Sequence, residues 1–162
     1  MKQALFLLPL LLCFQGCNES NAGSPPAQES GKDTLVSRVL HESSFNQYGD
    51  QTSKSTVIIR DIQSYENELA KRSDEYREPV NFETHTVLLV DMGRRNSGGY
   101  RIWVESVVAE NNYVRAQVIL SFPGENCVVA AAITNPYQFV EVSTTKDILL
   151  TEKIEIHDCP SS

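Results

Sequence analysis

The chain has 162 residues and carries 14 Lys and Arg against 21 Asp and Glu, for a formal net charge of −7. This acidic balance excludes a broad electrostatic surface for nucleic acid or for anionic lipid. The sequence has no spaced Cys/His zinc motif, no calcium loop and no phosphate-binding loop, so we expect neither a metal nor a cofactor.

The N-terminus has the order of an export signal. A lysine precedes an apolar run from Ala4 to Phe14 that is too short to span a bilayer. Gly16 and Cys17 follow, and this ending resembles a bacterial lipobox, although the two residues before Gly16 are unusual there. We therefore expect a lipoprotein signal peptide over residues 1–16 and lipid on the sulfur of Cys17. The alternative is ordinary secretion with cleavage elsewhere.

The expected location is the bacterial cell envelope. By the sorting pattern of such lipoproteins, Asn18 favours the outer membrane, facing the periplasm or the cell surface. Residues 17–33 are Ser, Pro, Gly and polar with almost nothing to bury, which predicts a flexible tether. Residues 34–160 are then one domain by size. Without residues 1–16, which hold Lys2 and no acid, the formal charge is 13 − 21 = −8.

The four cysteines divide by position. Cys13 lies in the signal run, and Cys17 is the expected lipid site. Cys127 and Cys159 remain as one pair in an oxidising compartment, so we predict a disulfide that fastens the C-terminal segment to the domain. Two free thiols, or a reactive Cys127, are the alternative.

The first part of the domain contains one ambiguous segment, one strand and one helix. Residues 34–45 suit a helix or a strand, and periodicity alone does not decide between them. Residues 56–61 are β-branched and predict a strand. A helix follows, with Ser64 as its expected N-cap and an end near Glu75. Its buried side should carry two apolar residues spaced four apart, Tyr65 and Leu69.

Three successive strands follow, with a glycine-rich basic loop between the first two. The first strand starts at Val87, and the second and third run over residues 100–108 and 113–122. In the second strand, alternation predicts one face with Tyr100, Ile102, Val104 and Val108, and an opposite face with Arg101, Trp103 and Glu105. In the third, the shared face is Val114, Ala116, Val118, Leu120 and Phe122. Such alternation marks antiparallel strands with one solvated side.

The last part of the domain adds further strands. Residues 127–134 form an apolar, Ala-rich run that predicts a strand, and the break at residues 135–137 ends it. Residues 139–143 predict another strand, and residues 148–156 predict the last one. The expected fold class is α+β, with a mainly antiparallel β-sheet or sandwich and one clear helix.

Four stretches carry a family resemblance: Asn81-Phe82, Thr86 to Gly93, Asn96 to Val104, and Ile133 to Val142. Together they resemble the PrcB C-terminal domain, whose pattern is an Asp-Phe pair, a strand ending in Gly, a Thr-Gly-Gly-Tyr loop and a late Pro-Tyr. Asn81 replaces the usual Asp, and Ser97 replaces the usual Thr. The resemblance covers about residues 55–145. It implies a lipid-anchored protein that binds and stabilises or regulates an envelope protein, such as a protease, with the lipid as its membrane contact.

A second likeness suggests an alternative function. Chagasin-type cysteine-protease inhibitors insert an Asn-Pro-Thr-Thr-Gly-Tyr-x-Trp loop into a protease cleft, and Asn96 to Tyr100 together with Trp103 are similar to it. The Pro is absent here, and Trp103 comes one residue later. This analogy implies a protease inhibitor that acts through the loop at residues 96–100.

The sequence does not indicate an enzyme. Ser97 lacks a Gly-x-Ser-x-Gly elbow, since Arg95 and Gly99 stand two residues away on either side. Cys127 with the neighbouring His157 and Asp158 would form a thiol triad only without the predicted disulfide. We therefore expect a non-catalytic protein.

The predicted partner-binding surface combines the basic loop with the later Pro-Tyr break at one end of the sheet. Its residues are Arg94, Arg95, Asn96, Ser97, Gly98, Gly99, Tyr100, Pro136 and Tyr137. Trp103 is a further candidate contact. Alternatively, the glycines serve only a turn, both tyrosines only cover the edge of the core, and a second layer of the domain covers Trp103.

Overall fold

The computed structural model describes residues 33–46 and 53–159. The predicted signal peptide, Cys17 and all of the predicted tether except Asp33 lie outside this range. In the described part of the chain, no helix has both the length and the apolar character required to cross a membrane.

Two β-sheets and one helix make up the described fold. The elements in chain order are β1 (Ser37–Ser43), β2 (Ser55–Ile59), α1 (Ile62–Ala70), β3 (Thr86–Asp91), β4 (Arg101–Ala109), β5 (Tyr113–Pro123), β6 (Tyr137–Val142) and β7 (Asp147–His157). The four-stranded sheet has the order β1-β6-β3-β2, and the three-stranded sheet has the order β4-β5-β7. All these pairings are antiparallel except that of β5 with β7, which is parallel.

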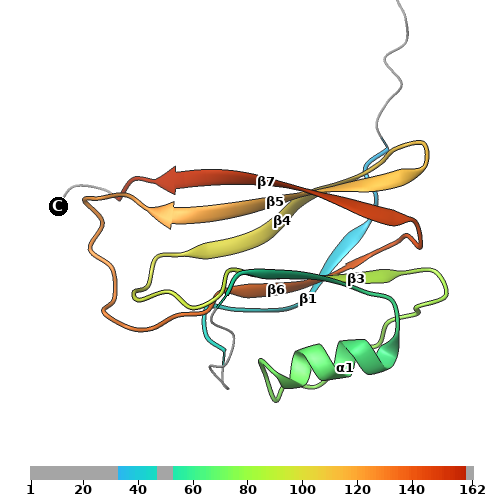
Figure 1. The fold of residues 1–162 in the computed structure, drawn as a ribbon, viewed down its shortest axis with the longest axis horizontal. Coiled ribbons are helices and arrows are strands. Elements are labelled where there is room, and N and C mark those ends of the chain that lie inside the picture. Colours follow the sequence, from blue (N-terminus) through green and yellow to red (C-terminus); the bar gives the residue numbers. More distant parts are fainter. Residues whose placement is uncertain (1–32, 47–52, 160–162) are drawn as a thin grey trace, which may run out of the picture. The chain divides into compact units, whose positions relative to one another are not determined.

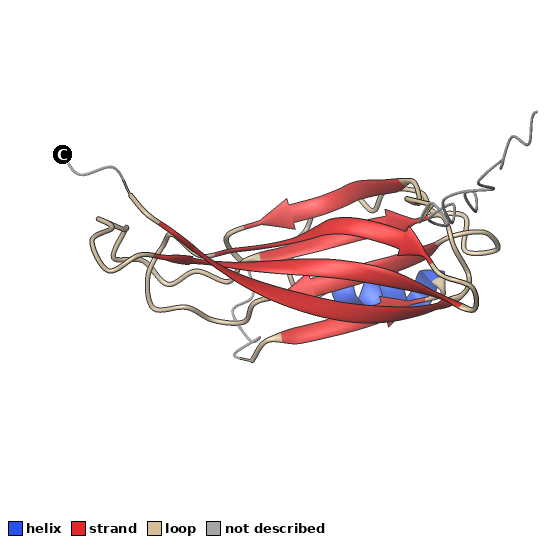
Figure 2. Ribbon diagram, turned by 90° about the horizontal axis from the view of Figure 1, so that it is seen from above, coloured by secondary structure: helices blue, strands red, loops and turns tan. Residues whose placement is uncertain are grey.

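The sheets form two layers, and α1 covers the outer side of the four-stranded sheet (Figures 1 and 2). One core cluster joins Val140 and Val142 of β6 with Val114 and Val118 of β5, so it lies between the sheets. A second cluster packs Tyr65 and other α1 residues against the opposite face of β3 and β6. The predicted class is confirmed: the fold is mainly β with one helix.

Strand β3 is buried along its whole length, because the other sheet covers one of its faces and α1 covers the other. This double burial explains its continuous apolar run, which ends at Asp91. Residues 34–45, for which the sequence left helix and strand open, contain the strand β1, which pairs with β6 at the sheet edge.

The helix begins earlier than predicted. Its N-cap is Asp61 instead of Ser64, because the Asp61 carboxylate accepts hydrogen bonds from the backbone N–H of Ser64 at 2.8 Å and from its hydroxyl at 2.7 Å. These hydrogen bonds, the backbone one first, lower the pKa of Asp61. The helix ends at Ala70, before the predicted Glu75, and the predicted buried pair Tyr65 and Leu69 is confirmed.

The residues predicted to share the inner face are confirmed for β5 but only in part for β4. The pairing of β4 with β5 shifts register between Val104 and Ser106, which marks a β-bulge. The extra residue turns the end of the strand over, so Val107 is buried at 1% exposure and Val108 is only half-buried. The prediction that Val108 shares the inner face was therefore wrong.

The predicted strand at residues 127–134 is also wrong. This segment connects β5 of one sheet to β6 of the other, so it crosses between the layers. Its ladder pairing is limited, in the described residues, to a single bridge between Thr134 and Arg95. An apolar run predicts a strand reliably only when apolar and polar residues alternate, and this run does not alternate. It contacts a neighbouring loop instead of adding a strand to a sheet.

Candidate functional site

Two sheet-crossing connections meet at one end of the sandwich. Residues 92–100 lead from β3 to β4, and residues 124–136 lead from β5 to β6. Both lie at the left of Figure 1, at the end where the last described residues of the chain also lie.

Hydrogen bonds join the two connections directly. The backbone N–H of Arg95 donates to the carbonyl of Thr134 at 2.8 Å, and the Thr134 N–H returns to the Arg95 carbonyl at 3.0 Å. The Gly98 N–H donates to the Ala130 carbonyl at 2.8 Å, and the Thr134 hydroxyl donates to the Ser97 carbonyl at 2.8 Å. These bonds bring together the two stretches that the sequence analysis placed at one end of the sheet.

Glycine is required at two positions of this end. Gly93 has φ +72° and Gly99 has φ +87°, both in the left-handed region. A Cβ at Gly99 would lie 2.8 Å from the Val129 side chain, and one at Gly93 would lie 2.6 Å from the backbone of Ser53. The glycine-rich loop is therefore closely packed against its neighbours.

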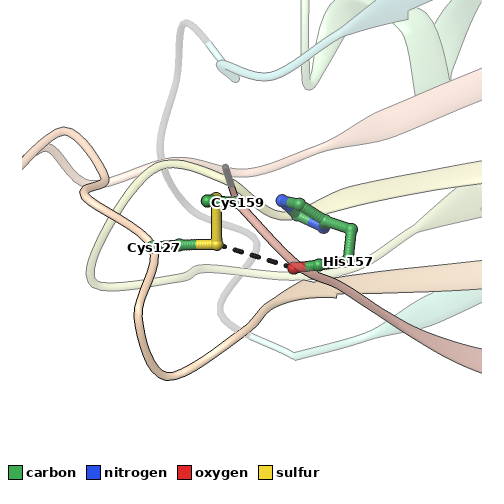
Figure 3. A group of neighbouring side chains, drawn as sticks. All are labelled: Cys127, His157 and Cys159. Atoms are coloured by element: carbon green, nitrogen blue, oxygen red, sulfur yellow. Dashed lines mark hydrogen bonds between the residues drawn. A yellow bond between two sulfur atoms is a disulfide. The ribbon is translucent and has the colours of Figure 1, made fainter. Parts of the chain in front are cut away.

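The predicted disulfide is present in the structure, between Cys127 and Cys159. Figure 3 shows it beside His157, whose carbonyl lies 3.5 Å from the Cys127 sulfur. The ligand atoms of these three residues lie within 4.8 Å of one another. The two sulfurs are bonded to each other, so neither is the thiolate that a metal would need. The bridge ties the end of β7 to the 124–136 connection.

Ten residues of these two connections are exposed, and we call five of them the loop surface: Arg94, Asn96, Gly99, Val128 and Ile133. The other five exposed residues are Glu125, Asn126, Ala130, Ala131 and Ala132. Val128 is 97% exposed and Ile133 is 54% exposed. Both are therefore available to contact another protein from a connection whose backbone is held by hydrogen bonds. Val128 and Ile133 were not among the predicted contacts, because the sequence assigned their segment to a strand.

Arg95 and Tyr100 belong mainly to the supporting structure. The Arg95 guanidinium donates to the Met92 carbonyl at 2.6 Å and lies 5.7 Å from the centre of the Tyr100 ring. Tyr100 packs edge-on against Phe122, with their ring centres 5.6 Å apart. Arg95 and Tyr100 are both half-buried. The Ser97 hydroxyl donates to the carbonyl of the next residue, Gly98.

The Pro-Tyr break lies in the interior. Pro136 is buried, and Tyr137 is 3% exposed and packs against Phe139. Burial raises the pKa of the Tyr137 hydroxyl. Both residues are therefore buried, as the alternative for the tyrosine supposed, and they line the shallow pocket that also contains Trp103. Their predicted role as partner contacts stays a prediction.

Trp103 lies on the outer face of the three-stranded sheet and is half-exposed. The Arg101 guanidinium lies 5.3 Å from its ring centre, and a shallow pocket beside both residues extends to Ser43 and Glu42 on β1. No second layer buries Trp103 in the part of the fold that is described, so it remains a candidate contact outside the loop surface.

Sequence reasoning missed a buried ion pair beneath the loop. Arg72 Nε donates to Asp91 Oδ2 at 2.8 Å, and both side chains are 0% exposed. Asp91 Oδ1 accepts from the Gly93 N–H at 2.7 Å, and Arg72 also binds Glu68 of α1 at 2.9 Å. Burial raises the pKa of Asp91, although these donors oppose the shift. The sequence did contain one signal for this pair: Asp91 follows a continuous apolar strand, and a carboxylate that is buried with such a strand needs a charged or hydrogen-bonding partner.

Comparison with known proteins gives one family match. Residues 86–143 match the family model described as PrcB C-terminal, which confirms the resemblance found in the sequence. The matched segment runs from β3 to just beyond β6 and contains the whole loop surface. No curated protein and no solved structure gives a significant match.

Proposed function

We propose that this protein is a non-catalytic, lipid-anchored component of a bacterial envelope complex, and that it binds a protease or another envelope protein through the loop surface. The family match supports the protease-related part of this proposal. The order of apolar run, Gly16 and Cys17 supports the anchor, and Asn18 supports the outer membrane.

The proposal rests on one observation: Val128 and Ile133 are exposed on a connection whose backbone is fixed by covalent and hydrogen bonds. The Cys127–Cys159 bridge and the hydrogen bonds from Arg95 and Gly98 hold this backbone in place before any partner arrives. A preordered surface loses little conformational entropy on binding, so its exposed apolar side chains contribute more of their burial energy to affinity.

A non-catalytic role agrees with the contacts of the histidines. His41 contacts Glu75, and His157 of β7 contacts Ser121 of β5. His85 contacts Thr84, the residue before it in the chain. Cys127 is consumed by the disulfide, so the thiol triad considered from the sequence lacks its nucleophile.

Capture from envelope membranes tests the proposed surface. The full chain with an affinity tag is crosslinked in its source cells, and captured proteins are identified by mass spectrometry. Val128→Ser and Asn96→Ala should each reduce recovery of the same envelope protein. Tyr76→Ser is the matched control, because Tyr76 is 82% exposed but lies in another connection. Undiminished recovery with both loop variants would contradict the assignment.

The same preparation separates a stabiliser from an inhibitor. If the captured protein is a protease, adding the purified full chain should leave its turnover unchanged or raise it and should lengthen its active lifetime. A loss of turnover that Asn96→Ala relieves would instead establish the inhibitor alternative. The anchor has its own test: Cys17→Ser should release the protein from the membrane fraction.

A further inference from the structure

Strand β7 forms an uncovered edge of the three-stranded sheet. It pairs with β5 on one side only, over all its residues from Asp147 to His157. The opposite edge, β4, is partly covered: Leu35 donates to the Val107 carbonyl, and the Val104 N–H donates to the Gln138 side chain. No described strand pairs with the other side of β7, although Lys54 and Arg60, which flank β2, bind the side chains of Glu152 and Asp147. Free backbone groups along so long an edge favour pairing with another strand.

The uncovered edge also exposes apolar side chains. Ile154 is 67% exposed and Ile156 is 70% exposed, and both point to the same side of the strand as the core residue Ile148. Lys153 and Glu155, on either side of Ile154 in sequence, point to the other side, where their charged groups lie 2.8 Å apart. The side with the isoleucines also carries Glu152, whose carboxylate accepts a hydrogen bond from Lys54 Nζ at 2.7 Å. The other side carries one charge of each sign.

We propose that β7 binds β7 of a second copy of this chain, antiparallel and centred on Ile154, so that the two three-stranded sheets become continuous. In this register Ile154 lies opposite Ile154 of the other copy. Lys153 of each copy then lies opposite Glu155 of the other. Opposite charges facing each other across antiparallel strands stabilise the pair, and so does the apolar pair of the two Ile154 side chains on its other face. On that face Ile156 of each copy lies opposite Glu152 of the other.

The charges select this register over its neighbours. In an antiparallel pair of two identical strands, some registers place one residue opposite the same residue of the other copy. Only these registers keep the outer faces of the two three-stranded sheets on the same side of the joined sheet. Centring the pair on Glu152, Lys153 or Glu155 would place a like charge opposite itself, which is destabilising. Centring on Ile154 avoids this and forms the Lys153–Glu155 ion pair on both sides of the symmetry axis, whereas centring on Ile156 places Glu155 opposite His157 and forms no such pair. This self-complementarity identifies a second copy as the occupant, and it does not depend on the loop surface.

Cysteine crosslinking in the full chain tests the register. In Ile154→Cys the two introduced sulfurs face each other, so a short thiol-to-thiol crosslinker should give a covalent dimer. Ile156→Cys is the matched control, since it has the same residue type, strand and face, yet its two copies are offset along the strands. The wild-type chain, treated in the same way, shows how much crosslinking arises from the native cysteines. Equal crosslinking of both variants, or none with Ile154→Cys, would overturn the proposal.

A charge exchange provides a second, independent test. Lys153→Glu and Glu155→Lys should each weaken self-association of the full chain in detergent by about tenfold, because two symmetric attractions become repulsions. The double variant should return association toward the wild-type value. Unchanged melting temperatures would confirm that the variants fold. A wild-type chain that stays monomeric, or a double variant as weak as the single ones, would contradict the proposal.

Discussion

At the residue scale, the adjacent arginines of the loop have different roles. The sequence treats Arg94 and Arg95 as equivalent exposed contacts. In the structure Arg94 is exposed, whereas Arg95 bonds the Met92 carbonyl and stacks over Tyr100. Arg95 therefore supports the loop from within, and Arg94 is the member of the pair that can reach a partner.

This difference predicts unequal losses of stability. Arg95→Ala should lower the free energy of unfolding by about 1–2 kcal/mol, because it removes a charged hydrogen bond and a cation–π contact. Arg94→Ala should change it by less than about 0.5 kcal/mol, as is usual for an exposed side chain. Denaturant unfolding of both variants measures the difference. Equal stability would show that Arg95 is no more anchored than Arg94.

The buried pair of Arg72 and Asp91 predicts a larger effect. Arg72→Met leaves the Asp91 carboxylate without its buried partner, which should cost about 3–5 kcal/mol. The double variant Arg72→Met with Asp91→Leu also removes the unpaired buried carboxylate, so part of the lost unfolding free energy should be recovered. Unfolding curves of the single and double variants give the comparison. A single variant that costs under about 1 kcal/mol would contradict the role of the pair.

At the element scale, the bulge in β4 sets which valine is in the core. Simple alternation from Ile102 predicts Val108 on the inner face, but the shift after Val104 places Val107 there instead. A bulge reverses every later side chain of its strand. It depends on pairing with β5, which alternation within β4 alone cannot reveal.

Alanine substitutions at these valines test the bulge. Val107→Ala should cost about 2–3 kcal/mol, because it removes two buried methyl groups and leaves a cavity. Val108→Ala should cost less than about 1 kcal/mol, because that side chain is half-buried. Thermal or denaturant unfolding ranks the two. The reverse ranking would mean that β4 continues without a bulge.

The sequence predicted elements better than it predicted burial. Alternation identified β5 and β6, and the pair Tyr65 and Leu69 identified the buried side of α1. The sequence left open whether Tyr137 is buried, because that burial comes from the layer that α1 adds to the four-stranded sheet. Proximity of the two loops was predictable, since both leave strands at the same end. Which loop atoms face solvent depends on their mutual hydrogen bonds, which no local pattern encodes.

At the scale of the whole molecule, one covalent bond holds the C-terminal end to the loop surface. Replacing Cys127 and Cys159 with Ser should cost about 3–4 kcal/mol, because the bridge closes a loop of intermediate length. The variant should also lose partner capture, since Val128 is adjacent to Cys127. Unfolding with and without reductant measures the first effect. No change on reduction would contradict the predicted contribution of the bridge.

The central claim is that the loop surface contacts another envelope protein. A photo-crosslinking amino acid at position 128 of the full chain, activated in the source cells, tests this most directly, with position 76 as the exposed control. We predict one dominant crosslinked envelope protein from position 128 that is absent from position 76. The same crosslinks from both positions, or none from position 128, would contradict the account.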